Sequence, residues 1–180
     1  MATIAQMLAN AASTIGIPPQ LAVEVGIQES ALNPAAVSSS GAIGVMQLMP
    51  GTAAQLGVDP TDAQQNINGG VTYLSQLYSQ FGSWDAALAA YNWGPGNVAS
   101  AQSAYGSDWL SHAPSSTQNY VSTILSNAGL AGDGSGAYQA GVSPASVVSA
   151  VTGQPVDNST ILLLTLGALG LYFLADFLFD

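Results

Sequence analysis

The sequence predicts a mainly α-helical domain with a small β element, followed by a linker and a C-terminal transmembrane helix. Helix-patterned segments, turns, most of the aromatic residues and the only two glutamates lie within residues 1–129. Residues 130–160 are rich in Gly, Ser, Ala, Val and Pro, a composition typical of flexible linkers. Residues 161–179 are almost wholly apolar and long enough for a helix of about 28 Å, close to the thickness of a hydrocarbon core.

Neither lysine nor arginine occurs among the 180 residues, and ten acidic residues give a formal net charge of −10. Such a chain cannot clamp phosphates or attract nucleic acid through cationic side chains. It lacks cysteine and has one histidine, His112, so it offers no ligand set for zinc or iron–sulfur clusters. A Schiff-base lysine for pyridoxal chemistry is also missing. We therefore expect no cofactor, no metal and no nucleic-acid partner.

Two helices are expected at the start of the chain. Residues 1–16 place apolar side chains on one helical face and contain no basic residue, which indicates an amphipathic helix rather than a secretory signal. Pro18 and Pro19 can begin a helix but cannot lie inside one, so a second helix is expected over residues 19–29. Glu29 then falls at the C-terminal end of that helix, where the helix dipole disfavours an anion. This placement favours a general acid with a raised pKa.

Two further segments contain candidate functional residues. Residues 38–53 place small residues and two glycines before Gln47, which indicates a glycine-rich loop or a short strand, with a hairpin packed on the core as the default interpretation. Residues 89–96 place aromatic side chains beside Asn92 at a Gly-Pro-Gly turn. That arrangement suits a carbohydrate groove and equally suits an edge of the core.

The linker and the C-terminal segment allow more than one interpretation. Within the linker, residues 144–151 can form a short helix with Ser143 as its N-cap. For residues 161–179, the alternative to a transmembrane helix is a buried C-terminal helix of the globular domain. The lack of a polar face favours the membrane.

Three of these clusters together resemble the successive signatures of the soluble lytic transglycosylase (SLT) domain. They are residues 28–34 (QESALNP), 41–50 (GAIGVMQLMP) and 90–96 (AYNWGPG). Their order and spacing match as well as their residues. Supporting matches occur at Asn66-Ile67, Gly70-Val71, Tyr73-Leu74 and Asn119-Tyr120-Val121. The resemblance covers about residues 15–127 and does not extend to the linker or the apolar segment.

The resemblance implies a lysozyme-like, mainly helical fold with a small β element. It also implies cleavage of the β-1,4 bond between N-acetylmuramic acid and N-acetylglucosamine in peptidoglycan. By position, Glu29 would be the catalytic acid/base, buried beneath Met49 and Tyr91. The residues that would bind the glycan are Ser38, Gln47, Met49, Tyr91, Asn92 and Tyr120.

In this family a second carboxylate is dispensable, because the substrate's own 6-hydroxyl attacks the anomeric carbon and closes a 1,6-anhydro ring. A site with one glutamate therefore favours transglycosylation over hydrolysis, unless Asp59, Asp62 or Asp85 folds into the cleft. The chain departs from the family where members often have Glu-Thr-Arg. Here Ser116, Thr117 and Gln118 follow one another, so a hydrogen bond or ion pair at the groove floor would be missing.

Three functions remain open. The first is a membrane-anchored lytic transglycosylase, the second a goose-type lysozyme that uses water, and the third a non-catalytic glycan-binding or pore-forming virion protein. A domain with a C-terminal membrane helix and no secretory signal would face the cytoplasm, where there is no peptidoglycan. A bacteriophage virion, in its viral membrane or ejection apparatus, is therefore expected ahead of a bacterial cell envelope. The expected partners are peptidoglycan, the membrane and other virion or envelope proteins.

Overall fold

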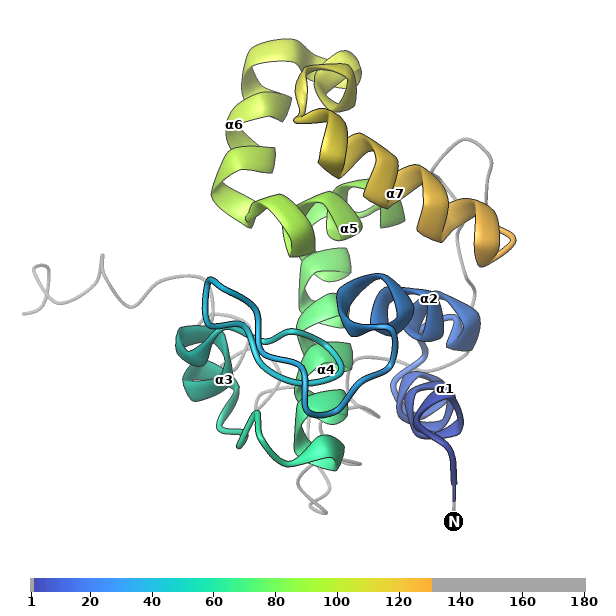
Figure 1. The fold of residues 1–180 in the computed structure, drawn as a ribbon. Coiled ribbons are helices and arrows are strands. Elements are labelled where there is room, and N and C mark those ends of the chain that lie inside the picture. Colours follow the sequence, from blue (N-terminus) through green and yellow to red (C-terminus); the bar gives the residue numbers. More distant parts are fainter. Residues whose placement is uncertain (1, 131–180) are drawn as a thin grey trace, which may run out of the picture. The chain divides into compact units, whose positions relative to one another are not determined.

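Helix α4 (Ala63–Phe81) runs through the middle of the part of the chain that the computed structural model describes, residues 2–130 (Figure 1). It packs against α1 (Ile4–Thr14), α3 (Pro50–Leu56) and α5 (Trp84–Trp93). Helix α2 (Pro19–Ser30) packs on α1 and on α7 (Ser115–Asn127), while α6 (Pro95–Tyr105) continues into the 3-10 helix η1 (Gly106–His112). A long loop connects α2 to α3.

The helix boundaries follow from local capping chemistry. A capping box begins α1, because Thr3 Oγ1 accepts from the Gln6 N–H and Gln6 Oε1 accepts from the Thr3 N–H. Proline opens α2 at Pro19, α3 at Pro50 and α6 at Pro95, where its missing N–H would have had no helical partner. The two helices predicted at the start of the chain are confirmed, with the second ending at Ser30.

A turn precedes α4. Asp59 accepts hydrogen bonds from the N–H and the hydroxyl of Thr61, and Asp62 accepts from the Gln65 N–H as the N-cap of α4. These carboxylates are therefore occupied in forming a turn and starting a helix.

The core joins the α2–α3 loop to the helices. A Cβ added at Gly70 of α4 would collide with Met46, and one added at Gly69 would crowd Val58 and Leu48. Two adjacent glycines thus let the loop lie directly against α4. The side chains with the largest fully buried volumes are Leu8, Leu21, Met46, Leu48, Ile67, Leu74, Leu77, Leu88 and Ile124.

The prediction that a short strand or hairpin forms the small β element is wrong. The α2–α3 loop contains two isolated bridges, Val37 with Ile43 and Ile43 with Leu48, and residues 2–130 contain no strand. The backbone gives the reason, because Gly41, Gly44 and Gln47 have φ values of 86°, 79° and 45°. Each of these positive φ angles turns the chain before a ladder of paired residues can extend.

The predicted fold class also included a transmembrane helix, and this part of the prediction is corrected as well. No helix within residues 2–130 is both long and apolar enough to cross a membrane. Helix α4 has 19 residues, but polar residues such as Gln64, Gln65 and Asn68 are exposed on it. The linker (except Leu130) and the apolar segment 161–179, where the membrane helix was predicted, lie outside the described residues.

Candidate active site

Glu29 lies in the last turn of α2 and faces α7. Its side chain is half-buried, and its Oε1 accepts a hydrogen bond of 2.6 Å from the hydroxyl of Tyr120. Tyr120 is itself buried in α7. The contact joins residues 91 positions apart, so it depends on the packing of α7 against α2.

The surroundings of Glu29 favour its neutral form. Burial raises its pKa above the ordinary value of 4.5, and the hydrogen bond from Tyr120 opposes that rise with a smaller effect. Desolvation penalises the carboxylate, whereas a donated hydrogen bond stabilises it. The chain contains no lysine or arginine that could offset the desolvation. A larger share of Glu29 therefore remains protonated toward neutral pH than for an exposed glutamate.

A second tyrosine, Tyr91, also lies close to this carboxyl group. The Tyr91 hydroxyl donates a 2.8 Å hydrogen bond to the Met46 carbonyl, and the Tyr91 ring is 5.4 Å from the ring of Tyr73. Burial raises the pKa of Tyr91 and of Tyr120 well above the ordinary value of 10.0, and the charge of Glu29 adds to the rise in both. Both phenols are therefore neutral hydrogen-bond donors near Glu29.

The α2–α3 loop is held to the helices by three side chains. Asn66 of α4 is fully buried; it accepts from the Met46 N–H at 2.8 Å and donates to the Ile43 carbonyl at 2.8 Å. Ser30, next to Glu29, donates to the Val45 carbonyl at 2.8 Å. Together with Tyr91, these bonds fix the loop relative to α2, α4 and α5.

A pocket of about 290 Å³ lies between this loop and the end of α5. Its lining is aromatic, apolar and amide-bearing, and none of the described residues adds a carboxylate to it. Tyr91 links the pocket to Glu29, which is close enough for its charge to act on the tyrosine but does not itself line the pocket. The lining residues are Gln47, Leu48, Met49, Thr52, Tyr73, Ala90, Tyr91, Asn92, Trp93 and Gly94.

The structure brings together most of the residues that the sequence indicated. Gln47, Met49, Tyr91 and Asn92 line the pocket, and Glu29 with Tyr120 lies beside it. The side chain of Met49 is 45% exposed. The hydrogen bond to Glu29 comes from Tyr120, for which the sequence predicted only glycan binding.

Three of the predicted side chains also have structural partners. Gln47 Nε2 donates to the Gly44 carbonyl at 2.8 Å, and Asn92 Oδ1 accepts from Thr117 Oγ1 at 2.9 Å. Ser38 does not line the pocket. Its Oγ accepts from the Ala42 N–H at 2.9 Å and shapes the turn there.

Several residues around the site were missed as site residues. Tyr73 and Trp93 line the pocket, while Ser30 and Asn66 hold its loop. Tyr73 had a detectable signal, since it lies three residues after Gly70 and so on the same helical face. Asn66 had two signals, its match to the SLT signatures and its place as a polar residue on a helix face that packs on the core.

The departures in α7 have a structural outcome. Gln118 Nε2 donates to the carbonyls of Ala113 at 2.8 Å and Ser111 at 3.2 Å. Ser116 is exposed, and the buried Thr117 reaches Asn92. Gln118 thus ties the start of α7 to η1 by neutral hydrogen bonds.

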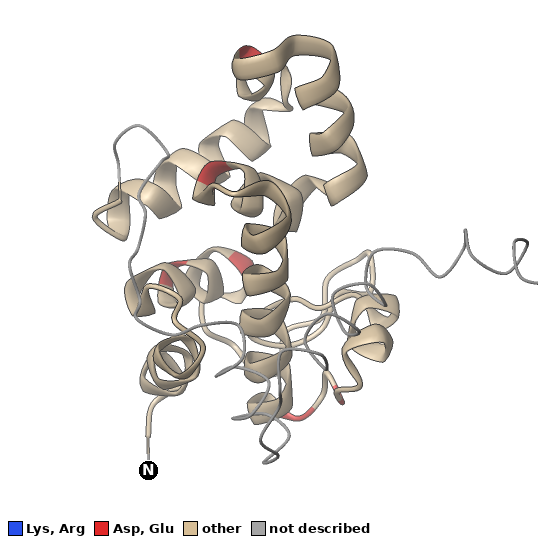
Figure 2. Cartoon of the chain, turned by 180° about the vertical axis from the view of Figure 1, so that it is seen from behind, with Lys and Arg blue, Asp and Glu red and all other residues tan. Residues whose placement is uncertain are grey.

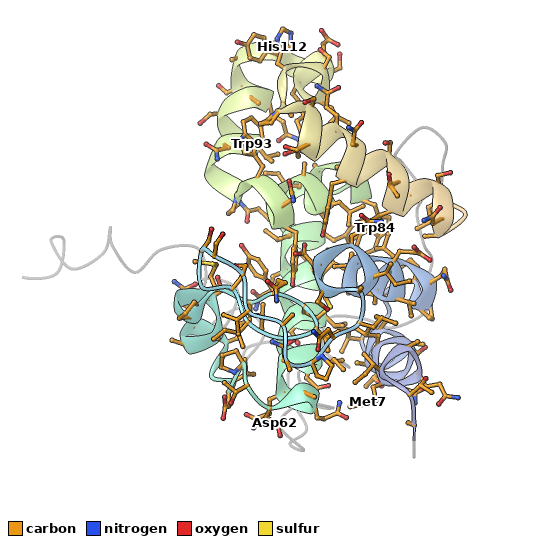
Figure 3. All side chains as sticks on the ribbon, in the orientation of Figure 1. Met7, Asp62, Trp84, Trp93 and His112 are labelled. Carbon is orange, nitrogen blue, oxygen red and sulfur yellow. The ribbon has the colours of Figure 1, made fainter. Side chains whose placement is uncertain are left out.

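None of the three candidate second carboxylates lines the pocket. Asp59 and Asp62 form the turn and cap before α4, and Figure 3 shows Asp62 at the end of the molecule opposite His112. Asp85 lies in the first turn of α5, whereas Tyr91 and Asn92 lie in its last turn. Within residues 2–130, the site therefore has one carboxyl group, that of Glu29.

The fold and the site define a class: a helical domain whose half-buried glutamate lies beside an uncharged aromatic pocket, as in enzymes that cleave sugar chains by acid catalysis. A family model described as the transglycosylase SLT domain matches residues 6–110, more than half of the chain. The chain belongs to this family, and the resemblance seen in the sequence is confirmed.

Relatives and solved structures agree with this assignment. The transglycosylase of Enterobacteria phage PRD1 is 31% identical over 170 residues, covering 91% of this chain and 59% of that protein. The soluble lytic murein transglycosylase of Escherichia coli (strain K12) is 43% identical over 94 residues, covering 46% of this chain and 15% of that protein. The chain thus spans less than two thirds of the length of these curated relatives.

Among solved structures, the 70 kDa soluble lytic transglycosylase from Escherichia coli has a TM-score of 0.63 and 33% identity, covering 69% of this chain and 23% of that chain. An inactive Glu-to-Gln mutant of the lytic transglycosylase Slt from Pseudomonas aeruginosa has a TM-score of 0.61 and 33% identity, covering 68% of this chain and 22% of that chain. These matches agree with a lysozyme-like, mainly helical fold.

Proposed function

We propose that this chain is a peptidoglycan lytic transglycosylase in which Glu29 is the catalytic acid and base. The observation that supports this most directly is the geometry of Glu29, a half-buried carboxyl with a raised pKa beside the aromatic pocket. The relatives named as transglycosylases, and the inactive Glu-to-Gln mutant among them, support the same assignment.

The first step uses the proton that burial keeps on Glu29. The carboxyl donates this proton to the glycosidic oxygen between N-acetylmuramic acid and N-acetylglucosamine. The bond from the anomeric carbon to that oxygen breaks, and N-acetylglucosamine leaves with a free 4-hydroxyl. Raising the carboxyl pKa toward neutral keeps more of the acid form available for this transfer.

The second step needs no further carboxylate. The 6-hydroxyl of the same muramic acid residue attacks the anomeric carbon, and Glu29 as carboxylate takes the hydroxyl proton. The products are a 1,6-anhydro end and a regenerated acid, and no water is consumed. The absence of another carboxylate from the pocket lining within residues 2–130 favours this route over hydrolysis with a carboxylate partner.

The pocket suits a neutral sugar. Tyr73, Tyr91 and Trp93 offer aromatic faces, and Gln47 and Asn92 offer amide groups. Aromatic rings pack against the apolar faces of sugar rings, while amides bond to hydroxyl and acetamido groups. We assign these five residues, together with Met49, to glycan binding next to Glu29.

The test is digestion of purified sacculi by the wild-type chain and by Glu29→Gln, with mass spectrometry of the products. The wild type should release 1,6-anhydro ends, and Glu29→Gln should lose at least about 100-fold in rate. Asp62→Asn is the matched control, because it makes the same chemical change at a remote cap that asparagine also fills. Reducing ends without anhydro ends would instead indicate a goose-type lysozyme. Equal activity of wild type and Glu29→Gln, or none in either, would remove Glu29 from catalysis.

We also propose that the protein acts from a bacteriophage virion and opens the wall locally when the phage enters the cell. The support is the phage transglycosylase that aligns with 91% of this chain. Zymography and mass spectrometry of purified particles should then find a lytic band containing this chain. Lytic activity confined to bacterial envelope fractions would contradict this proposal and favour an envelope enzyme.

A further inference from the structure

Two carboxylates of α2 accept hydrogen bonds from α7. Glu29 Oε1 accepts from the Tyr120 hydroxyl at 2.6 Å, and Glu24 Oε2 accepts from Asn127 Nδ2 at 3.1 Å. In α2, Glu24 precedes Glu29. In α7 the order of their partners is reversed, because Tyr120, the partner of Glu29, precedes Asn127, the partner of Glu24. The two helices therefore run antiparallel, and the seven residues between the α7 partners make about two turns that return to the same face.

Glu24 has no part in the chemistry proposed for Glu29, yet it is only 7% exposed. No lysine or arginine exists in the chain to pair with it. Among residues 2–130, its hydrogen-bond donors are two amides, Gln20 Nε2 at 2.8 Å and Asn127 Nδ2 at 3.1 Å. Gln20 belongs to the same helix, so the Asn127 bond is the one that crosses to α7.

An acid buried with neutral donors stabilises a fold less than an apolar side chain of the same size would. Buried polar groups of this kind can instead select one register between packed helices. A shift of α7 by one residue would move its side chains by about 1.5 Å along the axis and about 100° around it. Such a shift would break both hydrogen bonds, the one from Asn127 to Glu24 and the one from Tyr120 to Glu29.

We propose that Glu24 is a positioning residue: its hydrogen bond to Asn127 sets the register of α7 on α2 and thereby holds the Tyr120 hydroxyl on the carboxyl of Glu29. The inference rests on the role of Glu29 proposed above. Tyr120 from α7 donates the hydrogen bond that lowers the pKa of Glu29, and Tyr91 from α5 lies close enough for the charge of Glu29 to raise its own pKa. Neither tyrosine carries charge near neutral pH.

The consequence can be measured on the pKa of Glu29. The Tyr120 hydrogen bond lowers that pKa while burial raises it. If Asn127 no longer holds the register, Tyr120 bonds Glu29 for less of the time, and the pKa should rise further. A general loss of stability without a change of register would leave the pKa where it is.

Glutamate labelling makes this measurement direct, because Glu24 and Glu29 are the only glutamates in the sequence. Carboxyl-¹³C glutamate gives two signals in NMR, and Glu29→Gln identifies which is which. Asn127→Ala should raise the pKa of Glu29 by about 0.5, in the same direction as Tyr120→Phe. Gln20→Ala is the matched control, since it removes the other exposed amide from the same carboxylate without breaking a link between helices.

Tyr120→Phe combined with Asn127→Ala should raise the pKa no further than Tyr120→Phe alone, because both act through one hydrogen bond. Three results would overturn the proposal. The first is that the two substitutions raise the pKa of Glu29 additively, and the second is that Asn127→Ala leaves this pKa unchanged. The third is that Gln20→Ala and Asn127→Ala change it equally. Asn127 is exposed at the end of α7, so its alanine variant should fold. Glu24→Met, if it folds, should repeat the Asn127→Ala result. The titration needs no lytic activity, so an inactive chain that still shows the coupled shift would refute only the proposed function.

Discussion

At the scale of single residues, Glu29 combines opposed effects on one carboxyl group. Its place at the end of α2 is evident from the prolines and the helical pattern, but the size of its pKa rise is not. Burial against α7 and the Tyr120 hydroxyl act in opposite directions, and burial is the larger. The net result is a carboxyl group whose pKa is raised, so that more of it is protonated than an exposed glutamate would be at the same pH.

Glu29→Gln should make the protein relatively more stable as pH rises. The folded-state pKa of Glu29 lies above its ordinary value of 4.5, so between these two values the unfolded state ionises first. The wild type therefore loses stability as pH increases through this window, and the uncharged glutamine does not. Thermal melts should show the Tm of Glu29→Gln gaining on that of the wild type from low to neutral pH. A constant or shrinking difference would mean that burial does not raise the pKa.

Tyr120→Phe should move the alkaline limb of lytic activity to higher pH. The variant removes the hydrogen bond that lowers the pKa of Glu29 and leaves the burial that raises it. Because the proposed first step needs protonated Glu29, activity should persist to higher pH even where its maximum is reduced. The measurement is the pH profile of kcat/KM on sacculi. An alkaline limb shifted to lower pH would contradict the assignment of Glu29 as the acid.

At the scale of elements, the α2–α3 loop is the part that assembles the pocket. It has no strand to hold its shape, so it depends on groups from other elements: Asn66 from α4, Tyr91 from α5 and Ser30 from α2. These bonds tie the loop to the same helices that carry Glu29 and the pocket aromatics.

Asn66→Ala should destabilise the protein by about 2–4 kcal/mol, because it leaves buried backbone groups of Met46 and Ile43 without their partner. Asn68→Ala is the matched control on the same helix, where the side chain is exposed and, within the described part of the chain, bonds only Gln64. This variant should change stability by less than about 0.5 kcal/mol. Urea unfolding of both variants measures the difference. Similar losses would show that the loop does not depend on Asn66.

Gly70→Ala should cost about 1–3 kcal/mol, since the new methyl group would collide with Met46 and push the loop away from α4. Gly51→Ala in α3 has nothing within 4 Å of the added carbon and should be neutral or slightly stabilising. Thermal and urea melts of the pair test this close approach. Equal stability of both variants would contradict it.

At the scale of the whole molecule, the charge is all of one sign. Figure 2 marks Asp and Glu at several places along the described part of the chain and no Lys or Arg, in line with a formal net charge of −10. A bacterial wall is also largely anionic, so this chain has no long-range attraction toward its proposed substrate. We therefore expect binding at the proposed site to depend on short-range contacts in the neutral pocket.

Lytic activity on sacculi should therefore rise with ionic strength. Going from about 10 mM to about 150 mM salt shortens the Debye length from about 30 Å to about 8 Å and screens the repulsion. The rate on a short neutral glycan should change little over the same range, which separates screening from an effect on the site. A rate on sacculi that falls with salt would indicate attraction that this sequence does not provide.

The site could be predicted in part because its residues are local in sequence. The segments around Glu29, Gln47 and Tyr91 are short motifs whose order and spacing match the SLT signatures. The described structure brings all three segments to one pocket or to its edge. Ser38 does not line that pocket whereas Tyr73 and Trp93 do, because the side of a loop or helix that faces a pocket depends on packing with distant residues.

The β element shows the same limit. Small residues and two glycines before Gln47 suggested a hairpin, yet the backbone turns at Gly41, Gly44 and Gln47 leave two isolated bridges in the described residues. Side-chain hydrogen bonds from Asn66 and Tyr91 pair backbone carbonyls of the loop that a neighbouring strand would otherwise pair. A sequence pattern records local preference, whereas the choice of partner for each backbone group is made by the elements that pack around it.

The sequence by itself determined the family, the helical class, the catalytic candidate Glu29 and the absence of cationic side chains, since these follow from residue type and short spacing. Only the tertiary structure decided that Tyr120 bonds Glu29, that Glu24 and Asn127 add a second link between α2 and α7, and that the α2–α3 loop has no strand. These are contacts between residues far apart in the chain. Burial and hydrogen bonding across such contacts set the pKa of Glu29, and no local pattern encodes them.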